Sequence, residues 1–279
     1  MSSTFAAATA RGIPFLTMRW HDLLFAHWPV PVEALRGVVP ASVPIDTFDG
    51  TAWLGIVPFR MSRVRPFGLP LPREAFAYAE INVRTYVTVD RKPGVWFLSL
   101  DGDHRLAAFA ARVGFGVPYR NAYVRATAEG DGIAFESRHG TARPALFRGR
   151  YRPISEARTA PAGTFDDFVT NRLCLYAPRR GGGIQRVDVE HDPWPLQDAE
   201  VETQLDTMAA SHGIVLPDVE PRLLFARQLD VVAHRPVRVD APWRAGVRPE
   251  RRRTEARARR APGRRSQRGS RAHLDRRSD

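Results

Sequence analysis

Short runs of β-branched and aromatic residues, separated by turn residues, recur along most of this 279-residue chain. Such runs are typical of β-strands, because branched and aromatic side chains pack well on a pleated surface. The 23 prolines are spread over the same region and disfavour long helices, since proline interrupts helical hydrogen bonding. The predicted strands are Thr51–Phe59, Ala75–Val89, Val95–Leu100, Ala122–Ala128, Ile133–Arg138, Gln185–Glu190 and Leu223–Ala233.

Two of the separators, residues 90–94 and 129–132, have the composition of hairpin turns. Strands that follow one another through short turns pair antiparallel, so parallel βαβ units are not expected. The predicted fold class is mainly β (α+β): a closed antiparallel β-barrel-like sheet with a few peripheral helices.

Helices are predicted only outside this sheet. They are Val32–Val38, His104–Val113, Phe165–Arg172 and Leu196–Ser211. The second and fourth place apolar residues at helical spacing, and Asp103 is the expected N-cap of the second. The third is preceded by Thr164, which with Asp167 occupies the positions of a capping box.

The charge of the chain is concentrated at its C-terminal end. From Arg244 to Asp279 there are 14 arginines against four acidic residues, a net charge of +10, whereas the whole chain carries +12. The sequence therefore predicts a flexible N-terminus (1–17), a single β-barrel domain (18–243) and a disordered arginine-rich tail (244–279). The tail is either a weak, salt-dependent binder of nucleic acid or a non-selected extension.

Composition and motifs exclude several classes of protein. Cys174 is the only cysteine, which excludes an internal disulfide and a cysteine-based zinc site, and it is predicted to be an inert core residue. No signal peptide and no window apolar enough to span a membrane are found, so the expected location is the cytoplasm, without membrane association. The sequence contains no dinucleotide-binding glycine motif, P-loop or nucleophile elbow.

The residues from Glu80 to Val87 alternate between polar and largely β-branched side chains. In a strand, this period gathers four polar side chains on one face: Glu80, Asn82, Arg84 and Tyr86. Two interpretations are open. Either this face is solvated above a buried one, or it lines a polar cavity inside a barrel. In the second case Arg84 binds a carboxylate through its planar fork, and Glu80 acts as acid, base or partner of Arg84.

Two further clusters contain histidine. Residues 20–29 hold two histidines and two tryptophans, and either all are structural or His27 reaches into the same cavity. Residues 190–192 are Glu-His-Asp, but neighbours in an extended chain point to opposite sides. No metal site is therefore predicted there.

Eight segments of the chain carry a resemblance to a known family. They are Trp20–Val30, Asp46–Gly55, Val57–Met61, Glu80–Val87, Pro93–Phe97, Ser99–Asp101, Leu173–Tyr176 and His191–Leu196. They resemble the YqjF-like family of uncharacterised bacterial proteins (domain of unknown function 2071), roughly over residues 18–240. The resemblance implies a fold similar to the acetoacetate decarboxylase-like superfamily, a closed β-barrel around a small-molecule cavity.

Decarboxylases of that superfamily form a Schiff base through a lysine that follows a proline after a helix. The comparable segment here is Gly116–Arg120, in which Tyr119 stands where that lysine is expected. The only lysine, Lys92, falls in a predicted hairpin turn, where it is expected to be solvated and not activated as a nucleophile. Amine-based covalent catalysis is therefore not expected.

Together these features predict a protein that binds a small carboxylated or polar metabolite in the barrel cavity. The candidate binding residues are Glu80, Asn82, Arg84, Tyr86, His27 and Tyr119, and no cofactor or metal is predicted. The first alternative is a lyase- or decarboxylase-like enzyme with Glu80 as acid or base and Tyr119 as a second catalytic candidate. The second alternative is a structural domain whose basic tail associates with nucleic acid.

Overall fold

The computed structural model describes residues 14–66, 77–105, 112, 114–140, 142–179 and 181–239. The strands in this part of the chain belong to one sheet, and short helices lie outside it. The strands are β1 (Pro14–Val30), β2 (Ala52–Pro66), β3 (Tyr78–Val89), β4 (Lys92–Gly102), β5 (Tyr119–Asn121), β6 (Tyr123–Glu129), β7 (Gly132–His139), β8 (Ala145–Pro153), β9 (Cys174–Pro178), β10 (Ile184–His191), β11 (Leu196–Asp206), β12 (Arg222–His234) and β13 (Val237–Val239). The helices are α1 (Val32–Arg36), α3 (Phe165–Thr170) and the 3-10 helix η1 (Ala210–His212).

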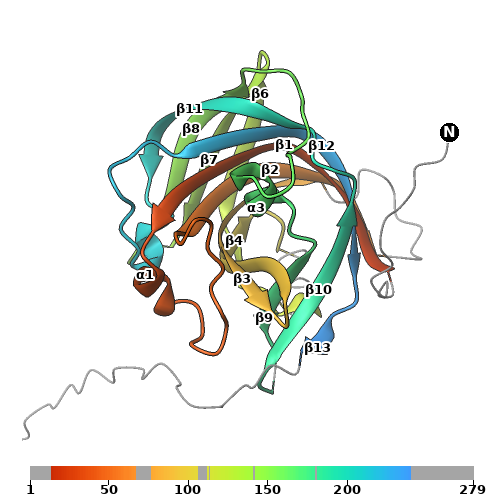
Figure 1. Ribbon diagram of the computed structural model, residues 1–279. Helices are drawn as coiled ribbons and strands as arrows, with labels where there is room; N and C mark the ends of the chain where they lie inside the picture. Colours follow the sequence, from red (N-terminus) through yellow and green to blue (C-terminus); the bar gives the residue numbers. More distant parts are fainter. Residues whose placement is uncertain are drawn as a thin grey trace, which may run out of the picture. The chain divides into compact units, whose positions relative to one another are not determined.

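Seven of the strands close into a barrel (Figure 1). Their hydrogen-bonded order is β10, β9, β4, β3, β2, β1 and β12, and β12 pairs with β10 to complete the ring. At this last seam Val189 lies opposite Ala233, and His191 lies opposite Val231. The predicted closed, barrel-like sheet is confirmed.

Two strand pairs are parallel, which corrects the prediction that all neighbours would be antiparallel. β4 pairs in parallel with β5, where Leu100 lies opposite Tyr119, and with β9, where Val95 lies opposite Leu175. Parallel partners need a crossover connection of about a dozen residues or more, and a longer stretch of chain separates β4 from both strands. The sheet is therefore mixed.

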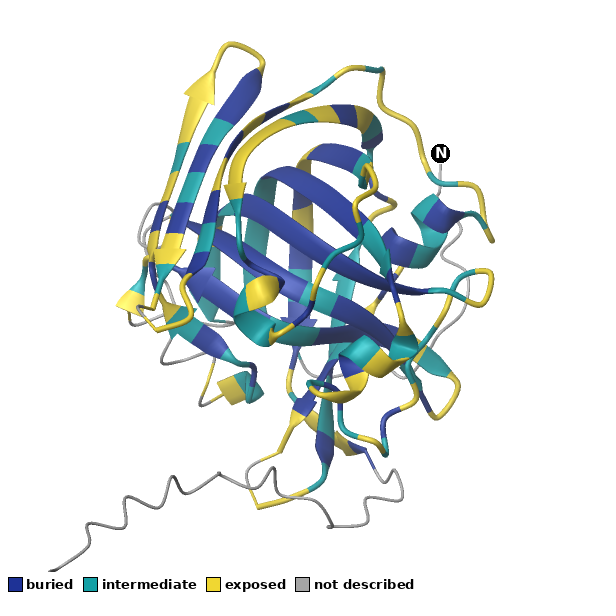
Figure 2. Cartoon of the chain, turned by 90° about the vertical axis from the view of Figure 1, so that its left-hand side faces the viewer, coloured by how far each residue is buried: buried dark blue, intermediate teal, exposed yellow. Residues whose placement is uncertain are grey.

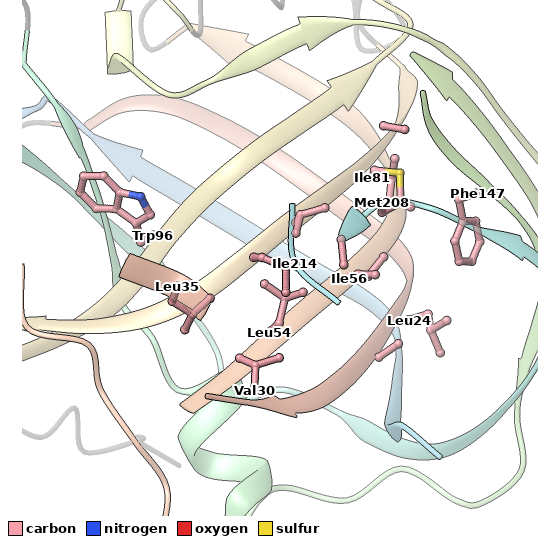
Figure 3. Packing of buried hydrophobic residues seen from close by; sticks show 14 of the residues in the cluster. Leu24, Val30, Leu35, Leu54, Ile56, Ile81, Trp96, Phe147, Met208 and Ile214 are labelled. Carbon is pink, nitrogen blue, oxygen red and sulfur yellow. The ribbon is translucent and has the colours of Figure 1, made fainter. Parts of the chain in front are cut away.

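Four further strands fold back over the outside of the barrel. β11 pairs with β12, and β8, β7 and β6 follow it in order. Leu24, Ile56 and Ile81 of the barrel pack in one apolar cluster with Phe147 of β8 (Figure 3). Phe135 of β7 belongs to the same cluster. This second layer covers barrel strands on the side away from the barrel interior, and Figure 2 shows long buried stretches in those strands.

The predicted helix Leu196–Ser211 is wrong, because residues 196–206 form β11 and only η1 follows with helical geometry. The spacing of Val201, Leu205 and Met208 suggested one buried helical face, but Leu205 is exposed and Val201 lies opposite Tyr151 of β8. Ladders with β8 and β12 give the backbone of this segment its hydrogen-bond partners. That pairing outweighs a weak local preference for helix.

The helices predicted at the two other described positions are confirmed in shorter form. α3 begins after Thr164, whose hydroxyl accepts a hydrogen bond from the Asp167 amide at 3.4 Å. The Asp167 carboxylate accepts from the amide of Gly163 at 2.9 Å, one residue before the position that a capping box requires. α1 occupies residues 32–36. Most of the helix predicted at 104–113 and all of the predicted tail, 244–279, lie outside the described residues.

The seven predicted strands are confirmed, as β2, β3, β4, β6, β7, β10 and β12. Six further strands were not predicted: β1, β5, β8, β9, β11 and β13. The predicted hairpin between β3 and β4 turns at Asp90 and Arg91, whose φ angles are 51° and 61°. Positive φ at both central residues is the geometry of a type I′ turn, which matches the twist of the flanking strands. Within the described ranges, no helix is long and apolar enough to cross a membrane.

Candidate ligand-binding site

A cavity of about 160 Å³ is lined by strands of the seven-stranded ring and by the segment that contains α3. Aromatic and aliphatic side chains form most of its wall. Among them, Trp20 stacks on Trp194 at 5.8 Å between ring centroids, and Phe25 meets the edge of Trp194 at 5.0 Å. An apolar cavity of about this size accepts a molecule of roughly the dimensions of benzene.

The polar face of β3 points into this cavity. Glu80, Asn82 and Arg84 all line it. The opposite face of β3 packs against the second layer, with Ile81 and Val83 in the outer apolar cluster. Neither face is solvated, so the interpretation of an ordinary amphipathic surface strand is wrong.

Arg84 is a cation without an anionic partner. Its guanidinium carbon lies 5.2 Å from the ring centre of Phe25 and 6.0 Å from that of Tyr86. Its Nε and Nη2 atoms are buried and have no hydrogen-bond partner, and no carboxylate of the described residues forms an ion pair with it. Next to Arg84, Gly55 makes room for His27, because a Cβ there would lie 2.8 Å from the Nε2 of His27.

Glu80 is the buried acid of the cavity, with only 3% of its surface exposed. Burial raises its pKa to about 7, although its contacts with the side chains of Tyr119 and Asn82 act in the opposite direction. Its neighbours are these two residues, and it does not form the expected ion pair with Arg84. Near neutral pH, the raised pKa allows Glu80 to both take up and release a proton.

Tyr119 of β5 completes the same end of the cavity. It is 4% exposed, and its buried hydroxyl contacts the side chains of Glu80 and Tyr78. Burial and the negative charge of Glu80 raise the pKa of Tyr119, so the phenol stays protonated. The absence of a side chain at Gly102 lets the ring of Tyr119 lie across β4.

His27 and Tyr86, both predicted as binding residues, do not line the cavity. His27 is fully buried, and its Nε2 lies 2.5 Å from the Tyr86 hydroxyl, which donates to the carbonyl of Val169 at 3.2 Å. Burial and the nearby Arg84 guanidinium lower the pKa of His27, which keeps the ring neutral. Through these two hydrogen bonds, Tyr86 connects β3 to His27 of β1 and to Val169 of α3.

Sequence reasoning missed the contribution of the segment that contains α3. Thr170 and Arg172 line the cavity, and Trp194 donates its indole N–H to the carbonyl of Thr170 at 2.9 Å. Arg172 donates to Asp46 at 2.6 Å and to the carbonyl of Phe168 at 2.5 Å, so its charge is neutralised. The only signal in the sequence was the capping pattern at Thr164, which predicts the helix but not that it packs against the cavity.

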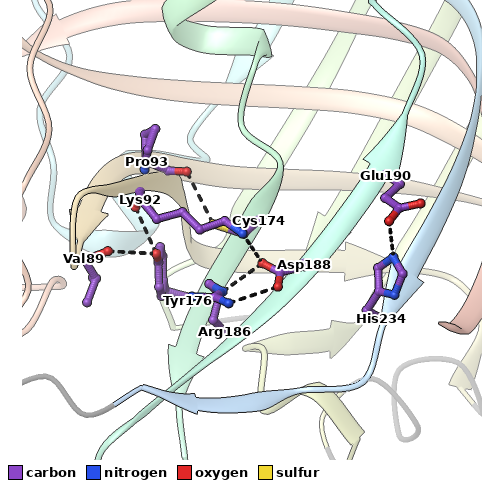
Figure 4. Close-up of polar contacts among 9 residues, drawn as sticks. All are labelled: Val89, Lys92, Pro93, Cys174, Tyr176, Arg186, Asp188, Glu190 and His234. Atoms are coloured by element: carbon purple, nitrogen blue, oxygen red, sulfur yellow. Dashed lines mark hydrogen bonds and ion pairs between the residues drawn. The ribbon is translucent and has the colours of Figure 1, made fainter. Parts of the chain in front are cut away.

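The only lysine of the chain, Lys92, does not line the cavity. Lys92 is the first residue of β4, and its amine donates to Asp188 at 2.8 Å, where Arg186 also binds (Figure 4). The expectation of a solvated lysine is therefore wrong, since cross-strand pairing brings Asp188 of β10 to it. Cys174 is buried as predicted, and burial raises the pKa of its thiol.

No group of three or more potential metal ligands is found among the described residues. At the seam that closes the ring, Glu190 pairs with His234 of β12 at 3.1 Å (Figure 4). The adjacent His191 turns toward the cavity instead. The side chains of Glu190 and His191 therefore point to opposite sides of β10, as expected for neighbours in an extended strand.

Comparisons with known proteins agree with the family resemblance. The family model DUF2071, described as an uncharacterized conserved protein, matches residues 17–230. The uncharacterized protein YqjF of Bacillus subtilis (strain 168) is 42% identical over 221 residues, which cover 79% of this chain and 91% of that protein.

Solved structures with a similar fold have low sequence identity. Acetoacetate decarboxylase from Legionella pneumophila has a TM-score of 0.58 at 12% identity, over 86% of this chain and 92% of its own. An acetoacetate decarboxylase-like enzyme from Sphingomonas wittichii RW1 has a TM-score of 0.56 at 12% identity, over 86% and 100%. The enduracididine biosynthesis enzyme MppR, in complex with pyruvate, has a TM-score of 0.56 at 10% identity, over 84% and 93%. The acetoacetate decarboxylase-like fold is thereby confirmed.

Proposed function

Because the chain belongs to the DUF2071 family and its barrel encloses a cavity with an unpaired arginine, we propose that it binds a small carboxylate there. The observation that carries the proposal is the state of Arg84, whose Nε and Nη2 are buried without a hydrogen-bond partner. A buried cation without a partner is costly, since it has lost its hydration. A carboxylate restores both bonds at once, because its two oxygens match the guanidinium fork.

The rest of the cavity sets the size and character of the ligand. The wall is mostly apolar, with aromatic rings such as Phe25 and Trp20 facing inward. Apolar walls with a few polar groups are typical of small-molecule sites, in which burial supplies affinity and the polar groups fix orientation. The ligand in this proposal is a compact molecule with one carboxylate and an apolar body.

A structural relative supports this ligand class. MppR has been solved in complex with pyruvate, which is a small carboxylate. The proposal for the present chain includes no Schiff base, because Lys92 lies outside the cavity wall and is paired with Asp188.

The test is calorimetric titration of the full chain with butyrate and benzoate, and with butyramide and benzamide as neutral matches. The carboxylates are expected to bind and the amides to bind at least about tenfold more weakly, because a charge-assisted hydrogen bond contributes about 1.5–3 kcal/mol. Arg84→Met should remove this difference, whereas Arg125→Met, on the exposed face of β6, should keep it. Equal binding of acids and amides, or a folded Arg84→Met variant with full affinity, contradicts the proposal.

A second candidate function is acid–base catalysis of the lyase or decarboxylase type, for which Glu80 is the specific observation. A carboxyl group whose pKa is about 7 can both take and give a proton near neutral pH. Tyr119, protonated beside it, can stabilise negative charge that develops on a substrate oxygen. The experiment follows pyruvate and 3-oxobutyrate with the protein in ²H₂O by NMR. Deuterium incorporation or decarboxylation that Glu80→Gln abolishes supports this function, and its absence from pH 5 to 9 contradicts it.

A further inference from the structure

The end of the cavity away from the Arg84 guanidinium holds an acid without a basic partner. Glu80 is 3% exposed, and among the described residues none of the groups that shift its pKa is basic. The one charged group among them is Asp101 of β4, which is itself acidic and is paired with Arg120 at 2.5 Å. The described part of the cavity wall therefore has one uncompensated group of each sign, the Arg84 cation and the Glu80 carboxyl group.

The neighbours of Glu80 leave this end of the cavity with hydrogen-bond acceptors only. The Tyr119 hydroxyl and the Asn82 side chain both contact Glu80 and lower its pKa, as groups that donate to a carboxylate do. Asn82 therefore presents its amide N–H to Glu80, while its Oδ1 atom is buried without a partner. Two donors do not exhaust a carboxylate, which has about four acceptor sites. The acceptors left for a ligand are Asn82 Oδ1 and the oxygens of ionised Glu80.

A primary ammonium group matches these acceptors in both hydrogen bonding and charge. It has three N–H donors and no acceptor, so it donates to Asn82 Oδ1 and to Glu80 at the same time. Its positive charge also compensates the charge of ionised Glu80, which a hydroxyl group does not do. A ketone oxygen offers only acceptors, and a second carboxylate would in addition lie beside a group of its own sign.

The spacing on β3 sets the distance between the two charged ends of such a ligand. Glu80 and Arg84 lie four residues apart on the inward face, which is about 13 Å between their α-carbons. The guanidinium of Arg84 lies near the ring of Tyr86, which is two residues further from Glu80. In an α-amino acid one carbon atom carries both charged groups, so the molecule is too short to reach both side chains. With a hydrogen bond of about 2.8 Å at each end, a chain of roughly three to five carbon atoms spans the remaining distance.

From this geometry we propose that the ligand is a short ω-amino acid, with its carboxylate on Arg84 and its ammonium group between Glu80 and Asn82. This inference rests on the proposed function, because it takes carboxylate binding at Arg84 as its premise. The carbon chain between the charged ends lies along the apolar wall, and its length suits a cavity of about 160 Å³. Glu80 and Asn82 are the residues that determine which carboxylates the site selects.

The experiment compares ligands of equal chain length that differ only at the far end. The full chain is titrated with 3-aminopropanoate, 4-aminobutyrate and 5-aminopentanoate, each beside the unsubstituted acid and the ω-hydroxy acid of the same length, and with 2-aminobutyrate. At least one ω-amino acid is expected to bind at least about tenfold more tightly than its matches and than 2-aminobutyrate, because it adds a charge-assisted hydrogen bond in a buried site. Glu80→Gln should reduce this preference to less than about threefold, whereas Glu202→Gln, exposed on β11, should keep it.

A second readout needs no variant. Calorimetric titrations at pH 7 in phosphate and in Tris, which differ in their heats of protonation, report the protons exchanged on binding. The ω-amino acid should release a fraction of a proton that the unsubstituted acid does not release, because its ammonium group favours the ionised form of Glu80, whose pKa is about 7 without ligand. The comparison of the two ligands cancels groups that respond to the carboxylate alone, such as His27 near Arg84.

The outcomes separate this inference from the proposed function. If the unsubstituted or hydroxy acids bind through Arg84 as tightly as the ω-amino acids, or if 2-aminobutyrate is preferred, the inference is overturned and carboxylate binding stands. A preference for the ω-amino group that survives in the folded Glu80→Gln variant, or that comes without proton release, also overturns it. If Arg84→Met binds all of these ligands as the wild type does, both fail.

Discussion

Glu80→Gln tests the buried acid of the cavity through the pH dependence of stability. The folded protein raises the pKa of Glu80 from an ordinary value of 4.5 to about 7, chiefly by burial. Glutamine has the same shape and carries no charge. The substitution therefore removes the titration with little change in packing.

The sign follows from the protonation of Glu80 in each state. Below pH 4.5 the group is protonated in the folded and unfolded chains alike, so it does not affect stability. Between pH 4.5 and about 7 the unfolded chain loses the proton while the folded chain keeps it, so the free energy of unfolding decreases as the pH rises. Above pH 7 both states are ionised and the decrease is complete. The difference between the two pKa values corresponds to a loss of about 3 kcal/mol.

The measurement is urea denaturation at pH 4.5, 5.5, 6.5 and 8 for the wild type, Glu80→Gln and the control Glu202→Gln. Relative to the wild type, Glu80→Gln should gain about 3 kcal/mol between pH 4.5 and pH 8. Glu202 is exposed on β11, so its variant should follow the wild type at every pH. The comparison also cancels Asp206, whose pKa burial raises to about 6 in all three proteins. A Glu80→Gln curve parallel to that of the wild type would refute a buried carboxyl with a raised pKa.

Three further predictions concern Gly55, the C-terminal residues 245–279, and Lys92. Gly55→Ala should lower the free energy of unfolding by about 1–3 kcal/mol, because the added methyl group meets His27. The control Gly37→Ala should not, because no atom lies within 4 Å of a Cβ at that position. Equal midpoints of urea denaturation for the two variants contradict this prediction. Removal of residues 245–279, which contain very few apolar side chains, should shift the melting temperature by less than about 2 °C in calorimetry. Reduction by sodium borohydride in the presence of pyruvate should add no mass at Lys92, and an adduct there restores Schiff-base chemistry.

The inward face of β3 could be read from the sequence because the strand is regular over its whole length. Glu80, Asn82 and Arg84 alternate with β-branched residues, and a period of two has one structural meaning in a strand. The sequence did not decide whether this polar face is solvated or lines a cavity. That choice depends on whether a second layer covers the opposite, apolar face of β3. That layer comes from β6, β7, β8 and β11, far from β3 in sequence, and no local pattern shows where it packs.

β1 was missed because its period is interrupted. The side chains that line the cavity are Met18 and Trp20, then Leu23 and Phe25, so the interval between inward residues changes from two to three and back. The change occurs at Asp22, which has a φ of 51° where the register with β2 shifts. An irregularity of this kind rotates the strand by one residue, and alternation then fails as a signal although the segment is a strand.

His27 and Tyr86 show a different limit of sequence reasoning. The period of residues 80–87 places Tyr86 in the cavity, and the cluster at residues 20–29 allows His27 either a structural role or a place in the same cavity. In the structure the Nε2 of His27 lies 2.5 Å from the Tyr86 hydroxyl, and neither side chain lines the cavity. Which polar groups pair with one another is decided by contacts across the ring, and a single chain pattern does not contain that information.

Of the basic residues in and near the cavity, Arg84 differs from the others, because it has no acidic partner among the described residues. Arg172, which also lines the cavity, is neutralised by Asp46, and Arg120 beside the cavity wall is held by Asp101 at 2.5 Å. Lys92, which does not line the cavity, is paired with Asp188 of β10. Among the described residues that line the cavity, a carboxylate therefore meets one uncompensated cation, Arg84, instead of a diffuse positive field. Because this attraction depends on one guanidinium group, replacing Arg84 alone should remove the selectivity for acids over amides. High salt should weaken that selectivity little, because charges in a buried site are screened less than charges on the surface.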